Sequence, residues 1–178
     1  MDVLLNRGYA HTHPNTLPKV LVYIVPNKAL AKSIQNGYWF TSAAPERPIE
    51  TFVFNDIGPE TEPALEHEVV MVCQAAVMTP RFQNWIAMHH SRVSRFVWDE
   101  FMTLVTDCGW RSDILDLRIG YPIQHVFLSG SAPQSLMPKI IEQPPFVNLV
   151  GAPVVLQSTN RTVGIARALV AVCGVREV

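Results

Sequence analysis

The sequence predicts an α+β fold, in which a mixed, mostly antiparallel sheet packs on one long amphipathic helix and two or three shorter helices. Three observations predict it: short runs of β-branched and aliphatic residues recur along the chain, 14 prolines interrupt it, and residues 80–108 have a helical apolar period. The prolines and short runs favour this arrangement over the alternative, an α/β three-layer fold. A chain of 178 residues has the length of one ordinary domain, so residues 1–178 are expected to form a single globular domain.

The N-terminal part of the chain is expected to begin with a strand and a helix. Residues 19–25 are rich in β-branched and aliphatic side chains and end before Pro26, which predicts a strand. Asn27 is suited to the N-cap of the following helix and Gly37 to its C-terminal end. Further strands are expected at residues 38–41, 51–57 and 68–73. The last of these contains a continuous apolar run, which predicts a central strand covered on both faces.

The clearest predicted element is a long helix over residues 80–108. Thr79 is suited to the N-cap, Pro80 to the first helical position and Gly109 to the position after the last turn. His89 lies in the apolar arc of this helix, which predicts that it is buried and structural. Beyond it, strands are expected at residues 113–119, 123–128, 146–150 and 153–157, and helices at 133–142 and 162–173.

Composition limits the partners that the chain is expected to have. No apolar run approaches the roughly 20 residues needed to cross a bilayer, so a membrane partner is not expected. A pI of 6.6 argues against nucleic-acid binding, which favours domains with a pI above about 9. Three scattered cysteines suit reduced thiols, and the N-terminus lacks a signal-peptide pattern, which predicts a cytoplasmic location. No cofactor is expected.

The leading functional hypothesis is a non-enzymatic interaction or assembly subunit that forms a homo-oligomer or binds a protein partner. Only 16% of the residues are charged, against roughly 25% in an average soluble domain, and surfaces covered by another chain would explain this deficit. Seven of the 15 acidic residues lie in residues 46–68, which could meet a basic surface on a second copy. The partner-binding residues expected on the long helix are Arg81, Arg92, Arg95 and Trp98.

The alternative is a small hydrolase or transferase with a metal or anion site. His11 and His13 stand two residues apart, so on an extended segment they point the same way and offer two metal ligands. Residues 11–14 resemble the His-x-His-Pro element of JAMM-type zinc metalloproteases over these four residues, but the upstream Glu and downstream Ser-x-x-Asp of that family are absent. The sequence leaves open whether the chain is an enzyme.

A weaker anion site is predicted after the strand at residues 123–128. Ser129, Gly130 and Ser131 connect that strand to a predicted helix, and backbone N–H groups at such a junction can bind an anion. The segment lacks the spacing of a phosphate-binding loop or of a hydrolase nucleophile elbow. Ordinary turn and capping chemistry is therefore the competing explanation.

Overall fold

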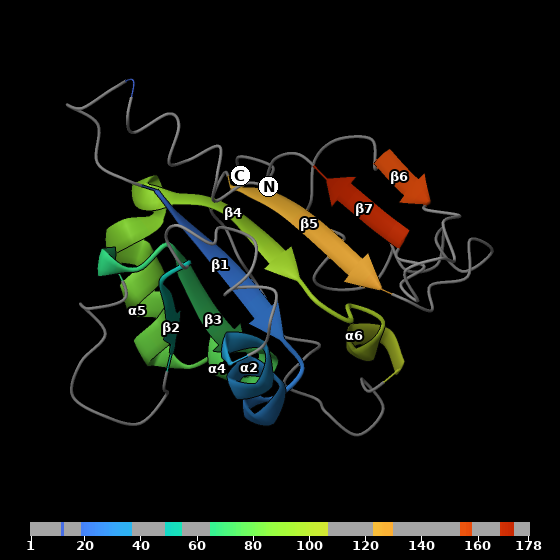
Figure 1. The fold of residues 1–178 in the computed structure, drawn as a ribbon, viewed down its shortest axis with the longest axis horizontal. Coiled ribbons are helices and arrows are strands. Elements are labelled where there is room, and N and C mark those ends of the chain that lie inside the picture. Colours follow the sequence, from blue (N-terminus) through green and yellow to red (C-terminus); the bar gives the residue numbers. More distant parts are fainter. Residues whose placement is uncertain are drawn as a thin grey trace. The chain divides into compact units, whose positions relative to one another are not determined.

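The computed structural model describes residues 12, 19–36, 49–54, 65–106, 123–129, 154–157 and 168–172 (Figure 1). The chain divides into two compact units, residues 1–95 and 96–178, and the boundary lies inside strand β4 (Val93–Trp98). In the described ranges, no helix is both long enough and apolar enough to cross a membrane. The prediction of a single domain stays a prediction.

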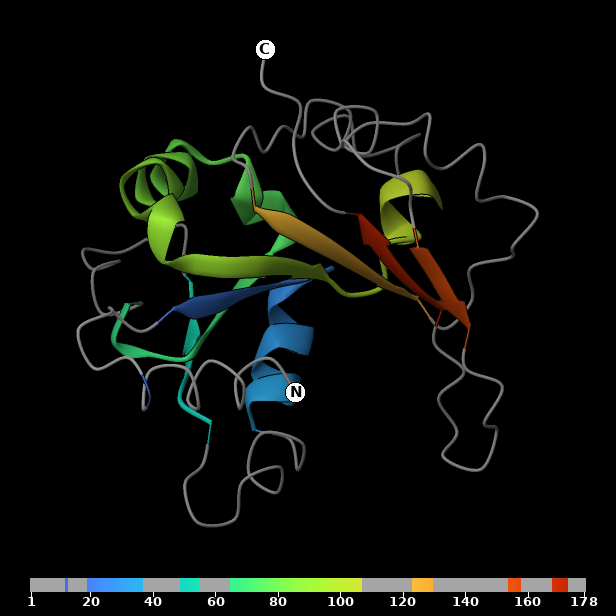
Figure 2. The same ribbon diagram turned by 90° about the horizontal axis from the view of Figure 1, so that it is seen from above.

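The first unit is built on a parallel group of strands. Its elements are β1 (Val20–Val25), α2 (Lys28–Gln35), β2 (Thr51–Val53), β3 (Val69–Cys73), α4 (Gln74–Val77), α5 (Pro80–His89) and the 3-10 turn η2 (His90–Arg92). Strand β3 pairs in parallel with both β1 and β2, and all five of its residues are buried, so it is the central strand that the sequence predicts. Figure 2 shows α2 and α5 on opposite sides of these strands.

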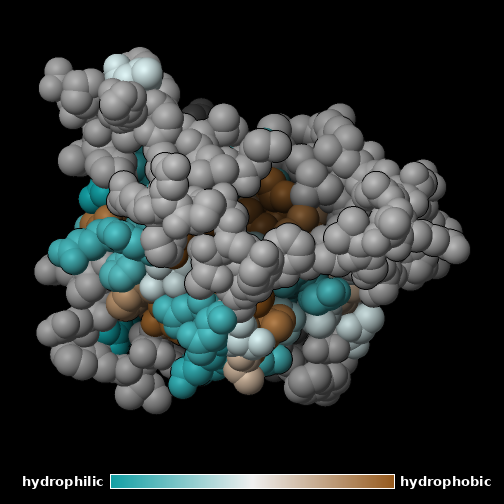
Figure 3. All heavy atoms as spheres, in the orientation of Figure 1, coloured by the Kyte–Doolittle hydropathy of each residue, from teal (hydrophilic) through white to brown (hydrophobic). Residues whose placement is uncertain are grey.

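Helix α2 starts where the sequence predicts. Asn27 is its N-cap, and the Asn27 side chain accepts a hydrogen bond from the Leu30 amide at 2.9 Å. This bond satisfies one of the amide groups that the first turn of a helix leaves unpaired. Hydrophilic side chains gather over α2 on the face shown in Figure 3, as expected for a helix with one buried residue, Ala31.

The second unit contains the end of β4, α6 (Thr103–Thr106), β5 (Gln124–Ser129), β6 (Val154–Gln157) and β7 (Ala168–Val172). Strand β7 pairs antiparallel with β5 on one side and with β6 on the other. Strands β5 and β6 confirm the strands predicted at residues 123–128 and 153–157.

The predicted α+β fold with a mostly antiparallel sheet is wrong. The strand order is β2-β3-β1-β4-β5-β7-β6, and the first five strands run parallel, which fits an α/β fold. Parallel strands buried on both faces show continuous apolar runs, as β1 (VLVYIV) and β3 (VVMVC) do. The prolines did not indicate antiparallel pairing, because Pro26 lies between β1 and α2 and Pro80 begins α5, the places expected for these two residues, and both positions occur in an α/β fold.

The predicted helix over residues 80–108 is correct only in its first third. Thr79 caps α5, with its hydroxyl accepting a hydrogen bond from the Phe82 amide at 3.4 Å, but the helix ends at His89. Strand β4 and the short helix α6 occupy most of the remaining described part, residues 93–106. Strand β4 reads VSRFVW, and β-branched and aromatic residues favour strands. Its apolar spacing fits a helical wheel equally well, which explains the error.

Two further predictions need correction. The helix predicted over residues 162–173 is wrong in its described part, because Ala168–Val172 form strand β7. Strands β5 and β6 supply hydrogen-bonding partners on its two sides. His89 is partly exposed at the end of α5, with its ring 5.8 Å from that of Trp85, and is not buried. The strands predicted at 38–41, 113–119 and 146–150 and the helix predicted at 133–142 lie outside the described residues.

Candidate functional site

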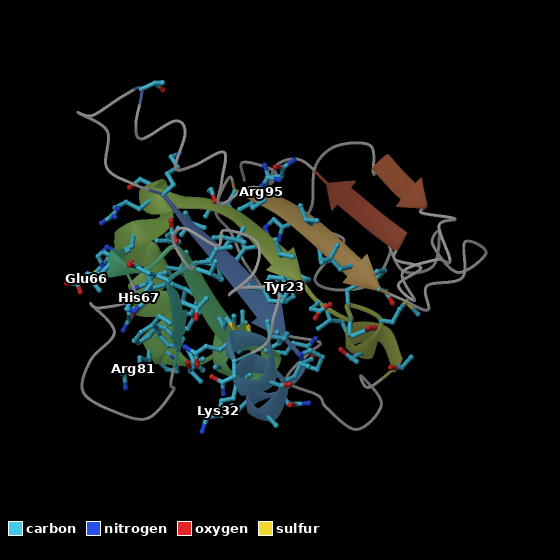
Figure 4. The ribbon with its side chains drawn as sticks, viewed as in Figure 1. Tyr23, Lys32, Glu66, His67, Arg81 and Arg95 are labelled. Atoms are coloured by element: carbon cyan, nitrogen blue, oxygen red, sulfur yellow. The ribbon has the colours of Figure 1, made fainter. Side chains whose placement is uncertain are left out.

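The arginines of the predicted partner-binding surface do not share a helix face. Arg81 lies on α5, Arg92 in η2 and Arg95 on β4, and Figure 4 shows Arg81 and Arg95 well apart. The guanidinium of Arg92 donates a hydrogen bond to the Leu65 carbonyl at 3.3 Å. Since the long helix is absent, the single basic face expected from it is absent too.

Trp98 does not present a surface to a partner. Its side chain is 1% exposed, and its indole N–H donates a hydrogen bond to His125 inside the second unit. Among the residues whose exposure the structure describes, Met88, at 68%, is the one large hydrophobic side chain that is exposed. A single exposed hydrophobic side chain is ordinary and does not by itself mark an interaction surface.

The weaker predicted sites are only partly described. His11, His13, Gly130 and Ser131 lie outside the described residues. Ser129 is buried at the end of β5, and its hydroxyl donates to the Glu100 carboxylate at 3.5 Å. A carboxylate at this position repels anions, which disfavours the predicted anion site. Within the described segments, no group of three or more His, Cys, Asp or Glu residues could hold a metal ion.

The turn after β4 holds Glu100 in a strained backbone conformation. Its φ of 46° lies in the left-handed region, which residues other than glycine seldom adopt. Neighbouring groups hold the turn in place: the Thr103 hydroxyl and amide both donate to the Glu100 carbonyl, at 2.8 and 2.9 Å. The Phe101 amide donates to the Leu128 carbonyl at 3.1 Å, which ties the turn to β5. The strain is therefore maintained by the surrounding structure.

Glu100 and Ser129 lie at the carboxyl ends of two strands and contact each other through their side chains. Glu100 follows β4 and Ser129 ends β5, and α/β folds bind ligands outside the carboxyl ends of their parallel strands. Asp99 and Glu100 are both partly exposed, and the Glu100 amide donates to the Asp99 carboxylate at 3.2 Å. Two adjacent carboxylates at this edge can accept hydrogen bonds from hydroxyl or ammonium groups.

The same unit contains a buried aromatic cluster around His125. The indole N–H of Trp98 donates to His125 Nδ1 at 3.0 Å. The rings of Trp98 and Phe127 are stacked with the imidazole at 6.1 Å between centroids, and the Phe96 ring lies tilted at 5.1 Å. Side chains alternate along a strand, so His125 and Phe127 share one face of β5 with Ser129.

His125 is neutral and carries an unsatisfied N–H group. Burial lowers the pKa of His125 from 6.5 to about 4, because desolvation penalises the charged ring. The Trp98 indole nitrogen can only donate, so Nδ1 of His125 is the acceptor and Nε2 of the neutral ring carries the proton. Nε2 is buried and has no hydrogen-bond partner in the described part of the chain. A buried polar group left in this state calls for an explanation.

The sequence carries a signal for each of these two places, and the prediction of a helix over residues 80–108 concealed the one at Asp99 and Glu100. Asp99 and Glu100 interrupt the apolar run between Trp98 and Phe101, which is a signal for a turn after a strand. His125 is a titratable residue inside an otherwise largely apolar predicted strand. Neither signal shows that the two segments lie side by side.

Comparison with known proteins found no match: no family model, no curated protein and no solved structure matches the chain. The function is therefore proposed from the geometry of the described residues around Glu100.

Proposed function

We propose that the chain is a ligand-binding α/β domain in which the Glu100 carboxylate binds a small ligand through its hydroxyl or ammonium groups. The observation that carries the proposal is the φ of 46° at Glu100. A residue with a Cβ in a left-handed conformation costs roughly 1–2 kcal/mol, which glycine would avoid. Backbone strain of this kind concentrates at functional sites, where the side chain is needed.

The surroundings of Glu100 select the chemistry of the ligand. Asp99 adds a second carboxylate beside it, and the Ser129 hydroxyl donates to the Glu100 carboxylate. Negative charge at this edge disfavours phosphates and carboxylates and favours hydrogen-bond donors. Polyols and small primary amines meet this requirement.

Assembly through apolar and charge-complementary surfaces stays a prediction from composition. The Glu100 site does not depend on it, because its described members belong to one unit of one chain. Ligand binding and oligomeric state can therefore be tested separately.

The test replaces Glu100 and measures stability and binding in the same protein. Glu100→Gly should raise the free energy of unfolding by about 1 kcal/mol, because glycine adopts positive φ without strain. The same variant should lose the NMR chemical-shift changes that ribose and ethanolamine cause in wild type. Glu100→Gln should lose ethanolamine binding and keep part of the ribose binding, since it removes the charge but keeps an acceptor.

The matched control is Glu66→Gln, which makes the same charge change at an exposed position of the other unit. It should bind both probes as wild type does. A Glu100→Gly protein no more stable than wild type would refute the strain argument. Absence of binding by both probes to wild type, or unchanged binding by Glu100→Gly, would refute the site.

A further inference from the structure

We infer that Ser129 makes the Glu100 site select primary ammonium groups over guanidinium groups, because its hydroxyl holds one of the two oxygens of the Glu100 carboxylate. The inference rests on the proposed function and names the class of amine that the same site takes. It starts from the hydrogen bond in which the Ser129 hydroxyl donates to Oε2 of Glu100 at 3.5 Å.

The two oxygens of the Glu100 carboxylate have different surroundings. Ser129 is 1% exposed, so Oε2 points toward a buried hydroxyl, whereas Glu100 itself is partly exposed. Among the described residues, Oε1 has no hydrogen-bond partner. A ligand that arrives from solvent can therefore bind at Oε1 and needs no space beside Ser129.

Backbone contacts keep the Glu100 carboxylate close to Ser129. The amide of Phe101, the residue after Glu100, donates to the carbonyl of Leu128, the residue before Ser129, at 3.1 Å. The Phe101 side chain is fully buried, and its ring packs edge-on against the Phe127 ring with 5.8 Å between centroids. The turn is therefore fixed to the end of β5, and Ser129 stays within reach of the carboxylate.

The two cations make different demands on a carboxylate. A guanidinium group binds most strongly through two parallel hydrogen bonds, one to each oxygen. A primary ammonium group is a compact charge, and each of its three N–H groups can bind a single oxygen. Because Oε2 of Glu100 is turned toward Ser129, a guanidinium group loses one bond of its pair, whereas an ammonium group at Oε1 loses none.

The neighbouring carboxylate does not offer the guanidinium group a better position. Oδ1 of Asp99 accepts a hydrogen bond from the Glu100 amide at 3.2 Å, so this carboxylate also has one oxygen in use. Within the described segments, each of the two carboxylates therefore has one oxygen without a partner. Single oxygens on separate side chains suit the separate N–H groups of an ammonium ion.

The test compares ethanolamine with 2-guanidinoethanol, which carries the same hydroxyethyl group on a guanidinium ion. NMR titration of the full chain gives the dissociation constant of each probe, and the ratio of the two constants measures the preference. Wild type should bind ethanolamine about tenfold more tightly, because the guanidinium group loses one charge-assisted hydrogen bond.

Two substitutions of Ser129 test the role of its hydroxyl. Ser129→Ala removes the donor, so the carboxylate can turn both oxygens toward the ligand, and the preference for ethanolamine should disappear. Ser129→Cys keeps nearly the same size with a weaker donor and should give an intermediate ratio. A general loss of structure would weaken the binding of both probes alike, so the ratio separates selection from folding.

The matched control is Ser94→Ala, which removes a serine hydroxyl that donates to the Val20 carbonyl at 3.1 Å in the other unit. It should keep the wild-type ratio. Wild type binding 2-guanidinoethanol as tightly as ethanolamine, or an unchanged ratio in Ser129→Ala, would overturn the inference and leave the Glu100 site in place. If neither probe binds wild type, the Glu100 site is refuted and the inference falls with it.

Discussion

The stability of this protein should fall between pH 6.5 and about 4 because His125 is buried in its neutral form. The pKa of His125 is lowered from 6.5 to about 4 by burial, so the unfolded chain takes up a proton in this range while the folded chain does not. Stability from this residue is fully present above pH 6.5 and is lost as the pH falls. Protonation of Nδ1 would also break the hydrogen bond from Trp98.

The burial of His125 sets how much stability is lost as the pH falls. A decrease in pKa from 6.5 to about 4 corresponds to about 3 kcal/mol, because each pKa unit is worth about 1.4 kcal/mol. Such a loss is a large part of the roughly 5–15 kcal/mol by which typical proteins are stable. It should appear as a steady decrease of the urea midpoint as the pH is lowered.

The measurement is urea unfolding of wild type and His125→Phe at several pH values from about 7 to about 4. His125→Phe removes the titrating group and leaves the Trp98 N–H without its acceptor, which adds a penalty that does not depend on pH. Other titrating groups contribute alike to both proteins, so the difference between the two curves isolates His125. His89→Phe, at a partly exposed position, is the matched control and should keep the wild-type dependence. If His125→Phe loses stability with pH as steeply as wild type, the reasoning fails.

Two other predictions concern packing and assembly. Phe82→Ala should lower the free energy of unfolding by about 3–5 kcal/mol, because the Phe82 side chain is fully buried and its ring packs against those of Phe54 and Trp85. The control is Met88→Ala, on the exposed side of the same helix, which should change the free energy of unfolding by less than about 0.5 kcal/mol. Equal chemical-denaturation midpoints for these two variants would contradict the position of α5 on the core. The scarcity of charged residues predicts that the chain self-associates, so light scattering should give a mass at least twice the 19.9 kDa of one chain. A mass of 19.9 kDa at every protein concentration and salt level would contradict this prediction.

Local signals in the sequence predict the elements whose structure depends on adjacent residues. The apolar run of β3 predicts a central strand, because a strand buried on both faces needs consecutive apolar residues. Asn27 predicts the start of α2, because an N-cap hydrogen bond joins residues that are close in the sequence. The same type of evidence is ambiguous for β4, whose apolar spacing suits a helix and a strand alike. Only pairing with neighbouring strands resolves it, and pairing depends on distant parts of the chain.

The sequence by itself determined the approximate positions of strands β1, β3, β5 and β6 and the starts of helices α2 and α5. It did not determine the α/β class, the strand conformation of β7 or the surroundings of any candidate site residue. Trp98 and His125 are 27 residues apart, and Ser129 and Glu100 are 29 apart, so their contacts exist only after β4 and β5 have come together. The hydrogen bond to Nδ1, the lowered pKa and the position of Glu100 beside Ser129 are decided by tertiary structure, because they depend on contacts that no local pattern encodes.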